Sequence, residues 1–160
     1  MHQEKIVSRK TLELICEKAR TNNQKIVFTN GCFDLLHVGH VRYLKEAKSL
    51  GDILVVGVNT DSSVKIIKGP RRPILAENHR AEIIACLYFV DYVSLFSEPD
   101  PLNLIKAVRP NVLVKGSDWA EEKIVGADFV RGYGGKIVRI DLSPGVSTSN
   151  IIRTIKERYC

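Results

Sequence analysis

Two histidines three residues apart, His37 and His40, have the side chains and the spacing for phosphate chemistry. They follow the apolar run 26–28, which is typical of a short buried strand, and precede residues 41–47, whose apolar spacing predicts a helix. The first N–H groups of a helix have no intrahelical partner and carry partial positive charge, so anions bind there. Either imidazole nitrogen can donate a hydrogen bond, and a modest rise in pKa would make the ring cationic. The spacing therefore predicts a phosphate site at a strand-to-helix turn.

Two glycines, Gly31 and Gly39, lie in the same turn. Because glycine lacks a Cβ, each lets the backbone bend tightly or approach a phosphate closely. The alternatives are a zinc pair or two ordinary surface histidines. A zinc site needs a third and usually a fourth ligand, and although Cys32 is near, no second cluster follows it. We therefore favour phosphate binding and expect no metal ligands in the protein.

The segment 29–40 reads T-N-G-C-F-D-L-L-H-V-G-H and resembles the H-x-G-H signature of the nucleotidyltransferase superfamily. Within this superfamily it is similar to the D-glycero-D-manno-heptose 1-phosphate adenylyltransferases, and the likeness runs from about Lys25 to Ile155. The resemblance implies transfer of AMP from ATP to heptose 1-phosphate, giving ADP-heptose and pyrophosphate for lipopolysaccharide core or another heptose-containing glycan. Mg²⁺ is expected with ATP, because it normally bridges nucleotide phosphates.

Three further segments match motifs of this family. The basic segment 65–74 contains Lys68, which matches a lysine that grips a phosphate during transfer, and we predict a mobile loop there. Residues 115–118 resemble K-G-x-D beside the ribose and base, and 147–149 resemble the I-S-T-T motif that holds the nucleotide phosphates. For Arg71 and Arg72, taken individually, the alternative is that they belong to a solvated basic loop. Arg80 is either structural or catalytic.

These matches, and the positions at strand ends, predict the following site residues. The predicted catalytic residues are His37, His40 and Lys68. The predicted nucleotide-binding residues are Thr29, Asn30, Gly31, Cys32, Phe33, Gly39, Lys115, Gly116, Asp118, Ser147, Thr148 and Ser149. The predicted substrate-binding residues are Asp34, Asn59, Asp61, Arg71 and Arg72.

The chain alternates predicted strands and helices, which implies an α/β fold with a doubly wound parallel sheet. Helices are predicted at 8–21, 40–50, 76–87, 100–108, 127–132 and 151–158, and strands at 25–30, 53–58, 92–96, 112–114 and 136–141. The family resemblance implies a Rossmann-like five-stranded sheet of order 3-2-1-4-5. We expect one nucleotidyltransferase domain over residues 1–160, in which residues 1–24 are an N-terminal helical extension.

The composition is that of a soluble globular protein, with 44% hydrophobic and 26% charged residues and a formal charge of +6. The basic residues form no long run, which favours phosphorylated small molecules over nucleic acid, and no segment is apolar enough to span a membrane. Four irregularly spaced cysteines indicate reduced thiols and a cytoplasmic protein. We expect a homodimer that lacks the sugar kinase domain often fused to this family, so that a separate heptose kinase supplies its substrate.

Two other functions remain open. One is a glycerol-3-phosphate cytidylyltransferase, although the arginine that precedes the hydroxyl motif in those enzymes has no counterpart in residues 141–145. The other is a non-catalytic nucleotide-binding or RNA-binding module, whose binding to nucleic acid would depend steeply on salt.

Overall fold

The computed structural model describes residues 2–141 and 143–160. Its helices are α1 (Arg9–Thr21), α2 (Val38–Lys48), α3 (Asp61–Lys68), α4 (Glu77–Ala85), α5 (Leu102–Val108), α6 (Ala127–Gly132) and α7 (Thr148–Tyr159). Its strands are β1 (Ile26–Gly31), β2 (Ile53–Asn59), β3 (Tyr92–Phe96), β4 (Val112–Gly116) and β5 (Lys136–Ile140). Short 3₁₀ turns lie at Gln3–Lys5 and Glu121–Lys123.

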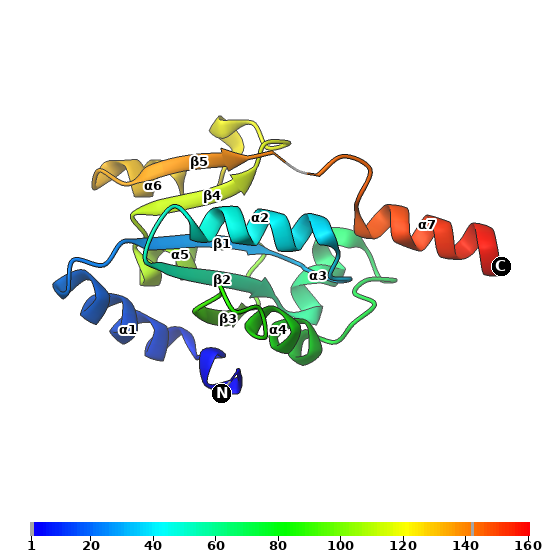
Figure 1. Ribbon diagram of the computed structural model, residues 1–160, viewed down its shortest axis with the longest axis horizontal. Coiled ribbons are helices and arrows are strands. Elements are labelled where there is room, and N and C mark those ends of the chain that lie inside the picture. Colours follow the sequence, from blue (N-terminus) through cyan, green and yellow to red (C-terminus); the bar gives the residue numbers. More distant parts are fainter. Residues whose placement is uncertain (1, 142) are drawn as a thin grey trace.

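The strands form one parallel sheet of order β3-β2-β1-β4-β5, which confirms the predicted fold class and strand order (Figure 1). The chain winds from β1 outward to β3 and then crosses back to β4 and β5. The winding direction therefore reverses between β1 and β4. In open α/β sheets, ligands bind outside the carboxyl ends of the strands at such a reversal.

Helices cover both faces of the sheet, and each face has its own apolar core. On one face α2 and α4 pack against the sheet through residues such as Leu44 and Ile84. On the other face α1, α5 and α6 do so through residues such as Leu12, Ile105 and Val130. All seven residues of β2 are buried, as expected of a strand covered on both sides.

The carboxyl ends of β1 and β4 separate at the reversal point. Their ladder pairs only Val27 with Val112 and Phe28 with Leu113, whereas β1 pairs with β2 as far as Gly31. The last residues of β1 and β4 therefore lie next to each other without a backbone ladder. This opening gives side chains at the two strand ends access to a ligand.

The predicted basic loop 65–74 is partly wrong, because its first residues belong to helix α3. Thr60 caps this helix by accepting a hydrogen bond from the Ser63 N–H at 3.4 Å, and the irregular segment begins only at Gly69. Lys68 therefore ends a helix. Gly69 has a φ of 94°, a conformation that glycine adopts without steric cost.

The two ends of the chain differ in how they pack. Within residues 1–24, helix α1 buries Leu12, Cys16 and Ala19 in one of the two cores, and Ile6 forms a bridge with Val93 of β3. Helix α7 has no buried residue, and it projects from the body of the domain (Figure 1).

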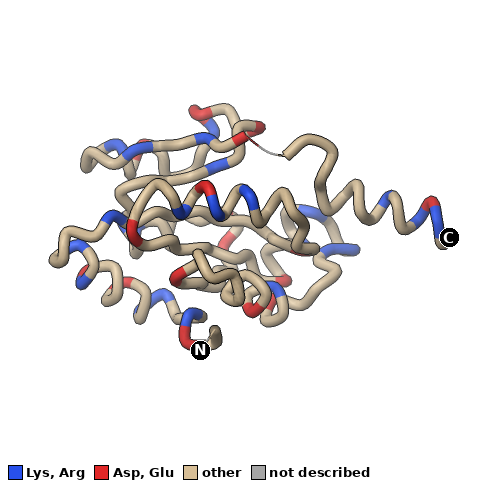
Figure 2. Tube along the Cα trace, viewed as in Figure 1, with Lys and Arg blue, Asp and Glu red and all other residues tan. Residues whose placement is uncertain are grey.

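Basic and acidic residues are spread along the entire chain trace (Figure 2). All four cysteines are free thiols, as predicted. Within residues 2–141 and 143–160, no helix has the length and hydrophobicity required to span a membrane.

Candidate active site

The two histidines lie at the N-terminus of α2, directly after the β1 turn. His37 is the N-cap residue, and its Nδ1 accepts a hydrogen bond from the His40 N–H at 3.4 Å. The rings stack with centroids 3.7 Å apart and planes at 19°, and Phe33 meets the His40 ring edge-on at 5.2 Å. Because Nδ1 of His37 accepts, the neutral ring carries its proton on Nε2, where it can donate to an anion.

Gly39 makes this stacking possible. A Cβ on Gly39 would lie 3.0 Å from ring atoms of His37, so a larger residue would push the imidazole away from the helix axis. The same Cβ would be 3.7 Å from Ser143 Cβ, which shows that the chain leading from β5 to α7 passes beside the first turn of α2.

Both histidines are neutral at physiological pH in the ligand-free protein. Burial lowers the pKa of His40 to about 4, with a further contribution from neighbouring His37, and burial also lowers the pKa of His37. The rings thus act as neutral hydrogen-bond donors until an anion raises their pKa. Nδ1 of His40 is buried and has no hydrogen-bond partner in the described chain.

The opening between β1 and β4 is bridged by Asn30 and Lys115. Nζ of Lys115 donates to Oδ1 of Asn30 at 2.6 Å and lies 5.8 Å from the centroid of the Trp119 ring. Burial lowers the pKa of this lysine to about 8, although Cys32 and Asp118 act in the opposite direction. An amine with this pKa, close to an exposed aromatic ring, can bind an anionic nucleotide and respond to pH.

Thr29 is fully buried in β1, and its hydroxyl is hydrogen-bonded to the Tyr43 hydroxyl at 2.8 Å. The hydroxyl of Thr29, which was predicted to bind nucleotide, is therefore engaged within the protein. Tyr43, which the sequence analysis missed, fixes the start of α2 against β1. Its position three residues after His40 on an amphipathic helix was the available signal.

Asp34, which was predicted to bind substrate, is also enclosed. Its Oδ2 accepts from Nε of Arg72 at 2.5 Å, and its Oδ1 accepts from the N–H groups of Ile74 and Leu75 at 2.7 and 3.0 Å. Asp34 is 1% exposed. The carboxylate therefore ties the segment after α3 to the histidine turn, and Arg72 is occupied by this ion pair.

Arg80 is fully buried and holds three separate parts of the site together. It donates to the carbonyl oxygens of Cys32 and Leu75 at 2.6 and 2.9 Å and to Oδ1 of Asp61 at 2.8 Å. This arrangement indicates a structural role for Arg80. It also engages Asp61, which was predicted to bind substrate.

Asn59 is 3% exposed, and its Nδ2 donates to Ser63 Oγ at 2.9 Å. This hydrogen bond connects the end of β2 to α3, so Asn59 faces the protein interior and does not face an open site.

Lys68 and Arg71 lie at the end of α3 and just after it, and both are exposed. Burial raises the pKa of the Cys32 thiol, and the positive charge of Lys68 opposes this shift, so Lys68 lies close enough to act on the β1 turn. Gly31 packs against Phe33, because a Cβ there would lie 3.1 Å from the Phe33 ring. Phe33 is buried and has a positive φ of 47°.

Ser147 is the N-cap of α7, since its Oγ accepts from the Asn150 N–H at 3.1 Å. Thr148 and Ser149 form the first turn of the helix. A hollow of about 240 Å³ lies along this turn between Gly145 and Ile155. Ser143, four residues before Ser147, lies beside Gly39 in the first turn of α2.

Gly116 and Asp118 lie at the end of β4 and just after it; Gly116 is buried and Asp118 exposed. Among residues 2–141 and 143–160, no group of three His, Cys, Asp or Glu side chains is placed to hold a metal ion. The structure thus brings Asn30, Cys32, His37, His40 and Lys115 to one edge of the sheet.

Comparisons with known proteins agree with this fold and motif. A family model described as cytidylyltransferase-like matches residues 28–154. The bifunctional protein HldE of Syntrophotalea carbinolica is 51% identical over 158 residues, which are 99% of this chain and 32% of that protein. HldE of Methylobacillus flagellatus is 54% identical over 136 residues, which are 85% of this chain and 28% of that protein. The chain thus spans about a third of the length of these relatives.

Two solved structures are similar to most of this chain. A lipopolysaccharide core biosynthesis protein from Thermoplasma volcanium aligns with a TM-score of 0.63 and 38% identity, covering 75% of this chain and 98% of that one. A pantoate-beta-alanine ligase from Francisella tularensis, complexed with an ATP ligand and beta-alanine, aligns with a TM-score of 0.64 and 18% identity over 96% of this chain and 79% of that one. The second likeness concerns the fold alone.

Proposed function

Because the chain belongs to the cytidylyltransferase-like family, we propose that it transfers AMP from ATP to D-glycero-D-manno-heptose 1-phosphate, forming ADP-heptose and pyrophosphate. The observation that carries the proposal is the stacked pair of His37 and His40 at the N-terminus of α2, beside the opening between β1 and β4. The residues around the pair resemble the heptose adenylyltransferases, and a 38% identical structure is titled a lipopolysaccharide core biosynthesis protein.

In the proposed reaction, an oxygen of the sugar 1-phosphate attacks the α-phosphorus of ATP. A new P–O bond forms to the sugar phosphate, and the bond from the α-phosphorus to the bridging oxygen breaks, with its electron pair leaving on pyrophosphate. The attacking phosphate oxygen is already anionic, so no general base is needed. Catalysis then depends on positioning and on stabilising negative charge as it develops.

The donors for that charge come from several elements at one edge of the sheet. Nε2–H of His37 and the first N–H groups of α2 face the bound phosphate, and His40 gains a proton or a hydrogen bond as negative charge approaches. Lys115 binds the nucleotide at the end of β4, and Lys68 at the end of α3 neutralises charge on the leaving or attacking group. These assignments rest on position and chemistry.

Mg²⁺ enters this proposal as part of the MgATP substrate. Among the described residues no three His, Cys, Asp or Glu side chains cluster, and Asp34, the carboxylate closest to the histidines in sequence, uses both oxygens within the protein. When bound to the nucleotide, the ion would neutralise charge on its phosphates.

A cytidylyltransferase acting on glycerol 3-phosphate is the second candidate, favoured by the description of the matching family model. The missing arginine before Ser147 argues against it. The segment that lacks the arginine is 141–145, of which Leu142 lies outside the described residues.

We further propose that the protein acts on small molecules in the cytoplasm, with its four thiols reduced, and that it forms a homodimer. The exposed apolar side chains of α7, including Ile155 and Tyr159 at 48% and 80% exposure, support self-association. Supply of heptose 1-phosphate by a kinase on a separate chain remains a prediction.

The test is pyrophosphate release with ATP or CTP, each combined with the α or β anomer of heptose 1-phosphate, with glycerol 3-phosphate, or with no acceptor. We expect release only with ATP and one heptose anomer. Release with CTP and glycerol 3-phosphate would establish the second candidate instead, and no release with any pair would leave a binding module.

A matched pair of variants links the reaction to the site. His40→Ala should reduce turnover at least about 100-fold, the usual effect of losing a transition-state donor. His79→Ala, which changes an exposed histidine on α4, should leave turnover unchanged.

A further inference from the structure

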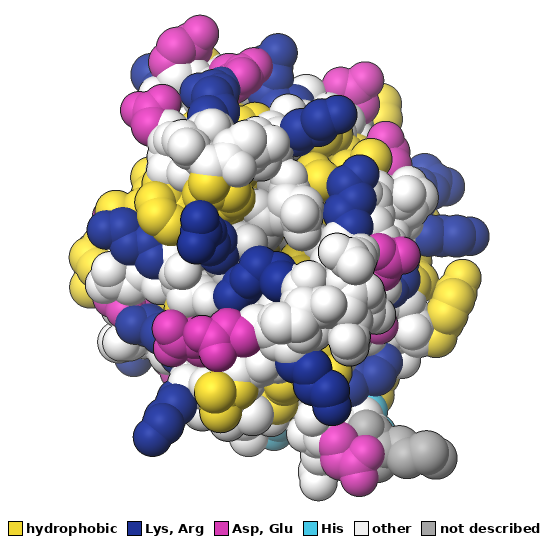
Figure 3. Space-filling view, turned by 90° about the vertical axis from the view of Figure 1, so that its left-hand side faces the viewer, with side chains coloured by type: hydrophobic (Ala, Val, Ile, Leu, Met, Phe, Trp, Pro, Cys, Tyr) yellow, Lys and Arg dark blue, Asp and Glu magenta, His cyan; other side chains and the backbone are white. Residues whose placement is uncertain are grey.

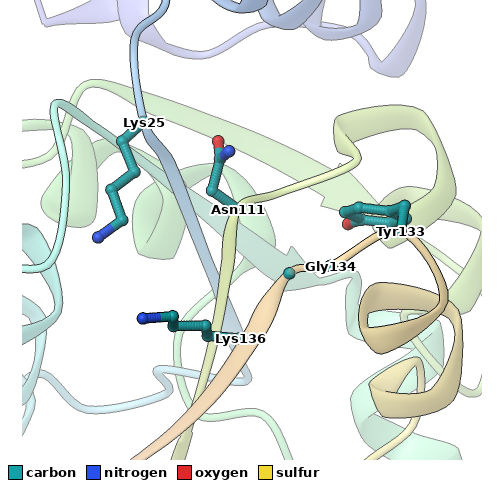
Figure 4. A pocket seen from close by; sticks show the side chains of 6 residues that line it. Lys25, Asn111, Tyr133, Gly134 and Lys136 are labelled. Carbon is teal, nitrogen blue, oxygen red and sulfur yellow. The ribbon is translucent and has the colours of Figure 1, made fainter.

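A second basic site lies at the opposite edge of the sheet from the histidines. Here the amino ends of β1, β4 and β5 surround a cavity of about 260 Å³ lined by Lys25, Asn111, Tyr133, Gly134, Gly135 and Lys136 (Figure 4). No Asp or Glu lines the cavity. The space is slightly smaller than the roughly 300 Å³ at which drug-sized ligand pockets begin, so it suits a small ligand.

Two lysines line this cavity, Lys25 just before β1 and Lys136 at the start of β5. The Ile26 N–H donates to Oδ1 of Asn111, and the Lys136 N–H donates to the Asn111 carbonyl at 2.9 Å, so Asn111 lies between the starts of β1 and β5. In Figure 4 the side chains of Lys25 and Lys136 extend to the same side of the β4 strand. Neither ammonium group has a hydrogen-bond or ion-pair partner within residues 2–141 and 143–160.

Asn111 supplies a third donor of fixed direction. Its Oδ1 accepts from the Ile26 N–H at 2.8 Å, and its Nδ2 has no acceptor in the described chain. The Asp52 carboxylate accepts from the backbone N–H of Lys25 at 2.6 Å, so it is engaged by the backbone at the start of β1.

The residues behind these donors include a positive charge, and several of their hydrogen-bond acceptors are already engaged. Arg109 lies 4.9 Å from the centroid of the Tyr133 ring, and the Tyr133 hydroxyl donates to the Pro110 carbonyl. At the end of α6, the Gly134 N–H donates to the Arg131 carbonyl and the Gly135 N–H donates to the Val130 carbonyl. Figure 3, which looks onto this end of the molecule, shows Lys and Arg side chains across the middle of the face, with acidic side chains among them.

We propose that this cavity binds a small phosphate-bearing anion, either inorganic phosphate or the phosphate of a small ester, through the Lys25 and Lys136 ammonium groups and Nδ2 of Asn111. Tetrahedral phosphate oxygens can accept from all three donors, and the anion offsets the repulsion between the two ammonium groups. The site lies across the sheet from the candidate active site, and it does not depend on the proposed function.

Amide NMR of the full chain tests this site separately from the active site. Inorganic phosphate is titrated in one arm and glycerol 2-phosphate in another, each against chloride at equal ionic strength. We expect saturable shifts of the Gly134 and Gly135 amides and of the Asn111 side-chain amide. The ligand with the lower dissociation constant identifies the source of the phosphate. Shifts that do not saturate, or that chloride reproduces, would overturn the proposal.

Variants then assign the donors. The double variant Lys25→Gln/Lys136→Gln should weaken phosphate binding at these amides at least ten-fold, and Lys136→Gln alone should weaken it less. The matched control Lys10→Gln/Lys45→Gln, which changes two exposed lysines elsewhere, should bind as the wild type does. Because all four side chains are exposed, the variants are expected to fold, and unchanged binding in the double variant would refute the assignment.

Discussion

Lys115 donates to Asn30 across the opening between β4 and β1, with 2.6 Å between Nζ and Oδ1. The two strands share ladder pairs only near Val27 and Phe28, so this side-chain bond is the link that spans their carboxyl ends. The lysine is partly buried, and burial lowers its pKa to about 8. It therefore changes charge within the pH range in which enzymes are commonly assayed.

ATP binding is predicted to weaken as pH rises through about 8, because Lys115 loses its charge there. Lys115→Arg should remove this alkaline limb, since guanidinium stays protonated, although its different shape lowers affinity at neutral pH. Calorimetric titration of ATP from pH 6.5 to 9.5 measures both effects. Lys123→Arg, which changes an exposed lysine in the 3₁₀ turn after β4, is the control and should keep the limb.

The pKa of Lys115 also affects stability. Its folded-state pKa lies below the ordinary value of 10.5, so between about pH 8 and 10.5 the unfolded chain binds more protons. This lysine therefore contributes a stability that increases with pH over that window. Lys115→Met should raise the free energy of unfolding below pH 8, where the wild type must bury a charge, while reducing ATP affinity. Lower stability of Lys115→Met at pH 7 would contradict this.

The His40 imidazole is predicted to titrate near pH 4 in the free protein and at higher pH when phosphate or ATP is bound. Its folded-state pKa lies below 6.5, so between about pH 6.5 and 4 the unfolded chain binds more protons, and the His40 contribution to stability is lost as pH falls through this window. Ring-proton NMR measures the pKa. A His40 pKa near 6.5 in the free protein, or a pKa that does not rise when ATP is bound, would contradict this prediction.

Gly39→Ala should disturb the histidine pair without unfolding the domain. The new methyl group would lie 3.0 Å from the His37 ring and displace it from the stack, so turnover should fall at least about ten-fold. Gly132→Ala is the matched control, because nothing lies within 4 Å of its added Cβ. The control should stabilise the protein by about 0.5 kcal/mol and leave turnover unchanged.

Asp34→Asn separates a structural role from substrate binding. Loss of the carboxylate leaves the Arg72 guanidinium without its partner, and the free energy of unfolding should fall by about 3 kcal/mol. Asp118→Asn, at an exposed carboxylate without an ion pair, should not change stability. Denaturant unfolding of both variants gives these values. Normal stability of Asp34→Asn combined with a raised KM for the sugar phosphate would restore the substrate-binding interpretation.

The sheet could be predicted from the sequence because its strands are continuous apolar runs, and β2 is buried throughout. Helix α3 was missed because it is short and mostly exposed, with only Ser63 and Val64 buried. Thr60 before Asp61 was a cap signal for this helix, but the Gly and Pro residues that follow favoured a loop.

The histidine turn could be predicted because its motif lies within twelve consecutive residues. The roles of Asp34 and Thr29 could not be predicted. The Arg72 partner of Asp34 is 38 residues away in sequence, and only the fold brings the two together. Thr29 depends on Tyr43, a hydroxyl contact that no strand pattern predicts. Polar residues at strand ends are therefore weak evidence for ligand contact until their partners are known.

The most direct test of the proposed reaction follows the α-phosphorus itself. The protein is incubated with MgATP labelled with ³²P at the α-position and with heptose 1-phosphate, and the products are separated. The account predicts that the label moves into a sugar nucleotide while unlabelled pyrophosphate is released, and that both fail in His40→Ala. Label that stays in ATP with both heptose anomers, or appears in free AMP or ADP, would contradict it.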